Sequence, residues 1–220
     1  MKTLFCLITA CLLVFPSLKP AAAADLTPGE VAARLQQTYD RTTTLTADFE
    51  QLTSMRMQSR QRRGAGTMAL SKPGRIRWDY LSPDRQVLVS DGTTVSMYFE
   101  KNRQMMVMPA QRYLNSDVTY AFFVGTGKIL KDFEVREPTV APFLAAGQYC
   151  IKLVPRKSHP QLDHLHLWID ATSWLVRRIQ LVDQVDSVTD IFFSNLAVNR
   201  AIPAGLFKFT PPPGTEVIEQ

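Results

Sequence analysis

Between residues 43 and 108 the chain repeats one pattern, in which apolar side chains occupy every second position. Successive side chains of a strand point to opposite faces of a sheet, so this alternation predicts half-buried β-strands. Two turn signals separate the runs: Pro73-Gly74 suits the centre of a type II turn, and Asp91-Gly92 suits a two-residue hairpin. The region is therefore predicted to form an antiparallel meander, which constrains the fold more than any other feature.

One amphipathic helix is predicted before the meander, over residues 28–41. Thr27 is a suitable N-cap, Pro28 suits the first helical position, and Glu30 completes a capping box. After the meander, capping residues favour a short helix over 115–124. Alternation then resumes in five segments, at residues 133–136, 148–155, 162–170, 175–183 and 187–194. No linker or internal repeat divides the chain, so residues 25–220 are expected to form a single domain.

A sheet of this length with few helices is expected to curl into a barrel or half-barrel. Apolar residues of one parity would line its concave face, namely Phe49, Met68, Leu70, Ile76, Trp78, Tyr80, Val95, Met97 and Phe99. Seven of the eight methionines follow the N-terminal segment, and flexible methionine side chains suit surfaces that accept variable apolar ligands. The pattern leaves two interpretations open, a filled core beneath the helices or an apolar cavity.

Residues 1–24 have the layout of a secretory signal, with a positive start, an apolar run over residues 4–15 and four alanines before Asp25. The run is too short to span a bilayer, so we expect cleavage before Asp25 and an exported, soluble chain. The alternatives are an uncleaved anchoring helix or a lipid attached at Cys11. Cleavage would lower the formal charge from +5 to +3. It would also leave Cys150 as the lone cysteine, expected to be a buried apolar side chain.

The motifs of catalysis and cofactor binding are missing from the sequence. It has no Gly-x-Ser-x-Gly, His-Glu-x-x-His or Cys-x-x-Cys, so no catalytic residue and no cofactor is predicted. Residues 125–128 resemble a phosphate loop, but Phe122 and Ile129 stand where that motif requires Gly and Ser or Thr, so a turn is expected instead. His164 and His166 share one strand face, and we expect an exposed convex face there rather than a metal site.

A basic run lies at the junction of the first two strands and consists of Arg56, Arg60, Arg62 and Arg63. Binding of single-stranded nucleic acid would also need interleaved aromatic side chains, which this run lacks, so no nucleic-acid partner is expected. We interpret the run as a solvated hairpin tip. Contact with an acidic protein or with anionic lipid headgroups is the functional alternative.

Three stretches together resemble the LolA family, the periplasmic carriers of outer-membrane lipoproteins. The first is residues 45–51 (LTADFEQ). The second begins at the Gly64-x-Gly66 motif, continues through residues 72–80 (KPGRIRWDY) and ends at residues 88–92 (LVSDG). The third combines Phe193-Ser194-Asn195 and Asn199 with residues 207–217 (FKFTPPPGTEV). The stretches occur in the family's order behind a secretory signal, and the resemblance covers essentially the whole chain after that signal.

The resemblance implies a mainly β fold, an unclosed antiparallel β-barrel with a lid of a few short α-helices over an apolar cavity for acyl chains. The nine concave-face residues would then bind lipid. The family commonly has Arg before the Pro of the second stretch, where it ties the barrel to the lid. Lys72 stands there in this chain and is assigned this lid-latch role, which Arg75 and Arg77 could share. A Lys lacks the planar fork of a guanidinium.

The function that the resemblance implies is that of a periplasmic, non-enzymatic chaperone. It would take acylated lipoproteins from an inner-membrane ABC transporter and deliver them to an outer-membrane acceptor. We expect a monomer without cofactor or metal. The alternative is a lipid- or lipoprotein-sensing regulatory module on the same fold, and an enzyme is the least favoured class.

Overall fold

The computed structural model describes residues 26–55, 60–116, 127–139 and 147–220. The strands of this part are β1 (Thr44–Met55), β2 (Arg60–Ser71), β3 (Arg75–Ser82), β4 (Gln86–Asp91), β5 (Thr94–Phe99), β6 (Gln104–Pro109), β7 (Phe133–Arg136), β8 (Gln148–Pro155), β9 (His164–Asp170), β10 (Val176–Val182), β11 (Val188–Val198) and β12 (Glu216–Glu219). The predicted meander and the five later strands are all present.

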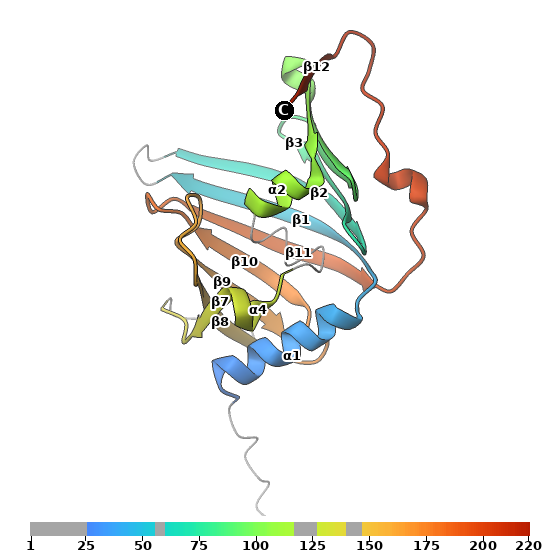
Figure 1. Ribbon diagram of the computed structural model, residues 1–220. Helices are drawn as coiled ribbons and strands as arrows, with labels where there is room; N and C mark the ends of the chain where they lie inside the picture. The colour runs from blue at the N-terminus through green and yellow to red at the C-terminus, as the bar shows by residue number, and fades with distance from the viewer. Residues whose placement is uncertain (1–25, 56–59, 117–126, 140–146) are drawn as a thin grey trace, which may run out of the picture.

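All of these strands form one curved sheet (Figure 1), in the order β12-β6-β5-β4-β3-β2-β1-β11-β10-β9-β8-β7. The long strand β1 lies near the middle and pairs with β2 on one side and β11 on the other. The edge strands β12 and β7 do not pair with each other. The fold is therefore the mainly β, unclosed half-barrel that the sequence predicted.

Helix α1 (Pro28–Arg41) has the bounds that the sequence predicted. The Thr27 hydroxyl accepts a hydrogen bond from the backbone N–H of Glu30, and the Glu30 carboxylate accepts one from the backbone N–H of Thr27. One face of the helix is buried through Val31, Leu35 and Tyr39. This face packs with apolar residues of the sheet in the main core, and α1 also contacts helix α4 (Ile129–Asp132) and strands β7 and β8.

A C-terminal arm, residues 199–215, connects β11 to β12 along the outside of the sheet (Figure 1). It contains the short helix η3 (Ala204–Phe207), whose Phe207 is buried. Phe209 packs on a second apolar cluster formed by Val87, Val89, Tyr98 and Met105 on the convex face. The arm ends in β12, which pairs parallel with β6, the one parallel pair among the named strands. The sequence predicted neither the arm nor this pair.

A short helix was predicted over residues 115–124, and residues 117–126 lie outside the described residues. Helix α2 (Ala110–Ser116) follows β6 directly, and the sequence predicted no helix over residues 110–114. Figure 1 shows α2 in front of the concave side of the long strands, between β6 and β1. A second short helix, η2 (Glu100–Asn102), makes the turn between β5 and β6.

Candidate functional site

The strand register places all nine predicted concave-face residues on the same side of the sheet. Leu70 lies opposite Ile76, and Met68 lies opposite Trp78, while Met97 lies opposite Leu88 on the next pair of strands. Residues directly opposite each other on adjacent antiparallel strands point to the same face. The same register connects the complete set, which is Phe49, Met68, Leu70, Ile76, Trp78, Tyr80, Val95, Met97 and Phe99.

Burial divides this face into two parts. Five of the nine side chains are at most 3% exposed and belong to the filled core, namely Phe49, Met68, Leu70, Ile76 and Val95. The other four, Trp78, Tyr80, Met97 and Phe99, are only half-buried. The Phe49 ring joins the two parts, because it lies 4.9 Å from both the Trp78 and the Tyr80 ring. The face is therefore a filled core at its base and a partly open apolar surface above it.

Further apolar residues of the same face were not in the predicted set. Leu88 lies opposite Trp78, Met106 opposite Met97, and Phe193 opposite Phe49. Their alternate positions in the strands match those of the neighbouring residues, so the alternation in the sequence could have identified them as well. Met105 has the other parity and packs in the convex cluster, and therefore only some of the methionines face the concave side.

Polar side chains border the apolar face toward the C-terminal end of β1. The Tyr80 hydroxyl donates to Gln51 Oε1 over 2.7 Å, and Gln51 Nε2 donates to Thr53 Oγ1 over 3.2 Å. Beside them is a pocket of about 210 Å³, lined by Gln51, Thr53, Met55, Arg62, Arg63, Gly64, Tyr80, Ser82, Pro83, Asp84 and Gln86. Burial raises the pKa of Tyr80 to about 12, so its hydroxyl remains a hydrogen-bond donor at neutral pH.

Lys72 contacts the last turn of α1. Its Nζ donates a hydrogen bond to the backbone carbonyl of Tyr39, and its backbone N–H donates to the carbonyl of Thr43 over 2.8 Å. An ammonium group at the C-terminal end of a helix also interacts favourably with the helix dipole. Burial lowers the pKa of Lys72. The residue thus connects the β2–β3 turn to the helix that covers part of the concave side.

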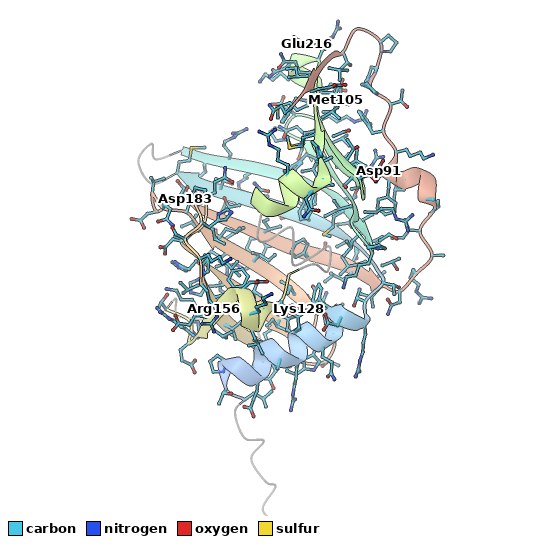
Figure 2. The ribbon with its side chains drawn as sticks, in the orientation of Figure 1. Asp91, Met105, Lys128, Arg156, Asp183 and Glu216 are labelled. Atoms are coloured by element: carbon cyan, nitrogen blue, oxygen red, sulfur yellow. The ribbon has the colours of Figure 1, made fainter. Side chains whose placement is uncertain are left out.

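Two other contacts hold the same helix. Lys128, labelled at the start of α4 in Figure 2, pairs with Asp40 over 2.9 Å. That lysine and a hydrogen bond from Gln36 hold the pKa of Asp40 below its usual range. The backbone N–H of Ile129 donates to Gln36 Oε1 over 2.8 Å. Lys128, from the segment that resembles a phosphate loop, therefore joins α4 to α1; residues 125 and 126 lie outside the described residues.

Arg75 and Arg77 do not share the contact made by Lys72, because their side chains lie on the opposite, convex face. Arg75 lies 5.6 Å from the ring centre of Phe207. Arg77 pairs with Asp79 over 2.6 Å and donates to the backbone carbonyls of Leu206 and Lys208. Both arginines therefore hold the C-terminal arm rather than α1. Both residues have odd numbers in β3, whereas Ile76 and Trp78 have even numbers, so the alternation along the strand already places the arginines on the other face of the sheet.

The prediction of an exposed face at His164 and His166 was wrong, because His166 is 0% exposed and Trp168 only 3%. Other groups cover this convex surface: the Arg178 guanidinium lies 4.0 Å from the Trp168 ring centre, and Thr139 lies against His166 Nε2. Burial lowers the pKa of His166 to about 4, so the ring is neutral at pH 7. Within the described ranges, no three His, Cys, Asp or Glu side chains are grouped to hold a metal.

The remaining candidates are Cys150 and the basic run. Cys150 is half-buried, and burial raises the pKa of its thiol to about 11, so the thiolate nucleophile is disfavoured. In the basic run, the Arg62 and Arg63 side chains are exposed, but both residues lie in β2, paired with Thr53 and Leu52, and not at the tip of the hairpin. Arg56 and the side chain of Arg60 lie outside what the structure describes. In the described part of the chain, no helix is long and apolar enough to cross a membrane.

Fold and site together define a half-barrel binding protein, whose apolar concave face is partly covered by helices and partly open. The chain belongs to the LolA family: the family model "Outer membrane lipoprotein carrier protein LolA" matches residues 40–210. This match includes every predicted concave-face residue and Lys72.

Curated relatives agree with this assignment. The chain is 31% identical over 198 residues to an outer-membrane lipoprotein carrier protein of Pseudomonas fluorescens. The aligned residues cover 90% of this chain and 92% of that protein. It is 28% identical over 212 residues to the protein of the same name from Dechloromonas aromatica, covering 96% and 95%. Among solved structures, an uncharacterized conserved protein from Thermus thermophilus has the same fold, with a TM-score of 0.53 and 14% identity over 87% of this chain and 98% of that one.

Proposed function

We propose that this protein carries lipoproteins by covering their acyl chains on its concave face. The observation that supports this most directly is the half-buried state of Trp78, Tyr80, Met97 and Phe99 above a filled apolar core. Burying one acyl CH₂ is worth about 0.8 kcal/mol, so several long chains together contribute some tens of kcal/mol. Chains of this kind need an apolar cover in water, and the names of the curated relatives describe such a carrier.

The nine concave-face residues are proposed to act in two ways. Phe49, Met68, Leu70, Ile76 and Val95 form the fixed base, because they are packed in the core. The half-buried residues would contact the ligand, and Met97 with the neighbouring Met106 could adapt to chains of different shape. A loosely complementary surface suits a carrier, since the cargo has to be released again.

Lys72 is proposed as the lid latch. Its hydrogen bond to Tyr39 holds the C-terminal end of α1 against the sheet, and Lys128 holds the same end of the helix through Asp40. Movement of α1 away from the sheet would need these few polar contacts to break together with the packing of its apolar face. Binding and release of cargo would then depend on a small number of identifiable interactions.

The wider pathway is also part of the proposal. Residues 1–24 would direct export and be removed, which would leave residues 25–220 as a single carrier domain in the periplasm. The carrier would receive lipoproteins from an inner-membrane ABC transporter and pass them to an outer-membrane acceptor. It would act as a monomer by binding alone, without catalysing a reaction.

A release assay tests this function. Purified protein lacking residues 1–24 would be incubated with spheroplasts, and the supernatant would be examined for lipoproteins. Acyl-chain binding would be followed in parallel through quenching of Trp78 fluorescence, with Trp78→Phe as the control for signal from the other tryptophans. We expect lipoproteins in the supernatant and quenching that depends on Trp78. Absence of both would refute the proposal, and quenching without release would favour a lipid-sensing module.

A further inference from the structure

Four polar side chains form a continuous hydrogen-bonded row across the concave face, which we call the polar belt. Tyr80 on β3 donates to Gln51 on β1 over 2.7 Å, and Gln51 donates to Thr53 over 3.2 Å. The hydroxyls of Thr53 and Thr189, the latter on β11, lie 3.1 Å apart. The belt borders the apolar rings of Phe49 and Trp78 on one side and the pocket of about 210 Å³ on the other.

The sequence of β2 explains how the belt can cross the sheet. Strand β2 lies between β3 and β1, and in the register Gly66 is opposite Tyr80 while Gly64 is opposite Gln51. A Cβ atom at position 64 would lie only 3.2 Å from the Tyr80 ring, and one at position 66 would lie 1.8 Å from the carbonyl oxygen of Asp79. Gly64 therefore leaves the space in which the Tyr80 ring lies across β2 to reach Gln51, and Gly66 allows the backbone of Asp79 to approach β2 closely.

The belt has more donor hydrogens than its own hydrogen bonds use. Tyr80, Thr53 and Thr189 each carry one hydroxyl hydrogen, and the Gln51 amide carries two. The three hydrogen bonds of the belt use one donor hydrogen each. Among the described residues, one Gln51 N–H and one threonine hydroxyl hydrogen thus remain available, whichever threonine donates to the other.

We propose that the polar belt binds the ester and amide carbonyl oxygens that join acyl chains to the cargo, and so fixes how deeply the chains enter. This inference rests on the proposed carrier function. Acyl chains that filled the face beyond the belt would cover its free donors without an acceptor, which is costly. A carbonyl oxygen accepts hydrogen bonds and donates none, so it matches the available groups. It is also the first polar group at the end of an acyl chain.

The charges around the belt favour a neutral acceptor over an anion. All four belt side chains are uncharged at neutral pH, since burial raises the pKa of Tyr80. The adjoining pocket contains Arg62 and Arg63 but also Asp84. A free phosphate or fatty-acid carboxylate would have to lie at the arginines, beyond the belt. The belt itself fits uncharged carbonyl groups.

Two synthetic lipopeptides with the same short chains test the proposal, one with ester-linked chains and the other with ether-linked chains that lack carbonyl oxygens. Their affinities would be measured by calorimetry for the protein without residues 1–24 and for a belt variant that combines Tyr80→Phe, Gln51→Leu, Thr53→Val and Thr189→Val. This variant removes all five donor hydrogens of the belt. The control variant is Thr67→Val, which makes a Thr→Val change on the exposed convex face. Ether-lipid binding also reports whether each variant is folded.

For the unsubstituted protein and Thr67→Val, we expect the ester to bind roughly tenfold more tightly than the ether analogue. For the belt variant, ester affinity should fall to that of the ether, while ether affinity stays unchanged or rises. Equal binding of both lipids by the unsubstituted protein, or an ester preference retained in the belt variant, would overturn the polar-belt proposal and leave the carrier function standing. Failure to bind either lipid would instead contradict the carrier function.

Discussion

Replacement of Lys72 by Met tests how strongly the latch holds α1. The variant keeps an unbranched apolar stem but removes the ammonium group that donates to the Tyr39 carbonyl. A hydrogen bond that involves a charged group contributes about 1.5–3 kcal/mol. The cost of desolvating the ammonium, which also lowers the pKa of Lys72, offsets part of this contribution. We therefore expect the docked position of α1 to lose about 1–2 kcal/mol, a factor of about 5–30 in the opening equilibrium.

Amide hydrogen exchange measures this opening directly. Backbone amides of α1, such as that of Leu35, should exchange about 5–30 times faster in Lys72→Met, while amides of β9 and β10 keep their protection. Lys72→Arg should restore most of the protection, because a guanidinium can donate to the same carbonyl. The matched control is Lys101→Met, which removes an exposed ion pair to Asp84 at 3.6 Å and should change nothing measurable. Unchanged α1 exchange in Lys72→Met would refute the latch.

Three further predictions concern the parts of the fold that support the site. Leu35→Ala should lower the free energy of unfolding by about 2–5 kcal/mol in urea titrations, because Leu35 is 0% exposed; a loss under about 1 kcal/mol would contradict its place in the core. Phe207→Ala should speed proteolysis within residues 199–215 without changing amide exchange in β8 and β9, and uniform loss of protection would show that the arm is part of the global core. The buried His166, with its pKa lowered to about 4, binds a proton more weakly than in the unfolded chain, so the free energy of unfolding should fall as pH drops from about 6.5 toward 4. His166→Phe should flatten this part of the plot of unfolding free energy against pH. An unchanged slope in that variant would assign the pH dependence to other groups.

Local patterns predicted the elements whose structure is determined by local chemistry. The capping box at Thr27 and Glu30 gave the start of α1, and the period-two alternation gave the strands and the shared face of the nine residues. Gly74 has a φ of +73°, as expected for the Gly of a type II turn. These features depend on neighbours in the sequence, so one chain was sufficient to find them.

Features that depend on distant contacts were beyond the sequence pattern. His166 and Trp168 have the alternation of an exposed face, but Arg178 and Thr139, from other parts of the chain, cover them. The arm has no periodicity, and its position depends on Arg75 and Arg77 meeting its aromatic rings and carbonyls. The polar belt needed the register, since only pairing shows that Gly64 lies between Tyr80 and Gln51.

The size of the sheet explains why part of the concave face is left for a ligand. Twelve strands at a spacing of about 4.8 Å extend about 53 Å along the curve, measured between the two edge strands. Helix α1 has 14 residues and is therefore about 21 Å long, and α2 and α4 are shorter still. Among the described elements, α1 covers the β7–β8 side of the sheet, where Ile151 and Leu153 are buried. Trp78, Met97 and Phe99 lie on the other side, where the described helices leave them half-buried. An apolar molecule that packed on these side chains would complete their burial, which is the physical basis for expecting acyl chains there.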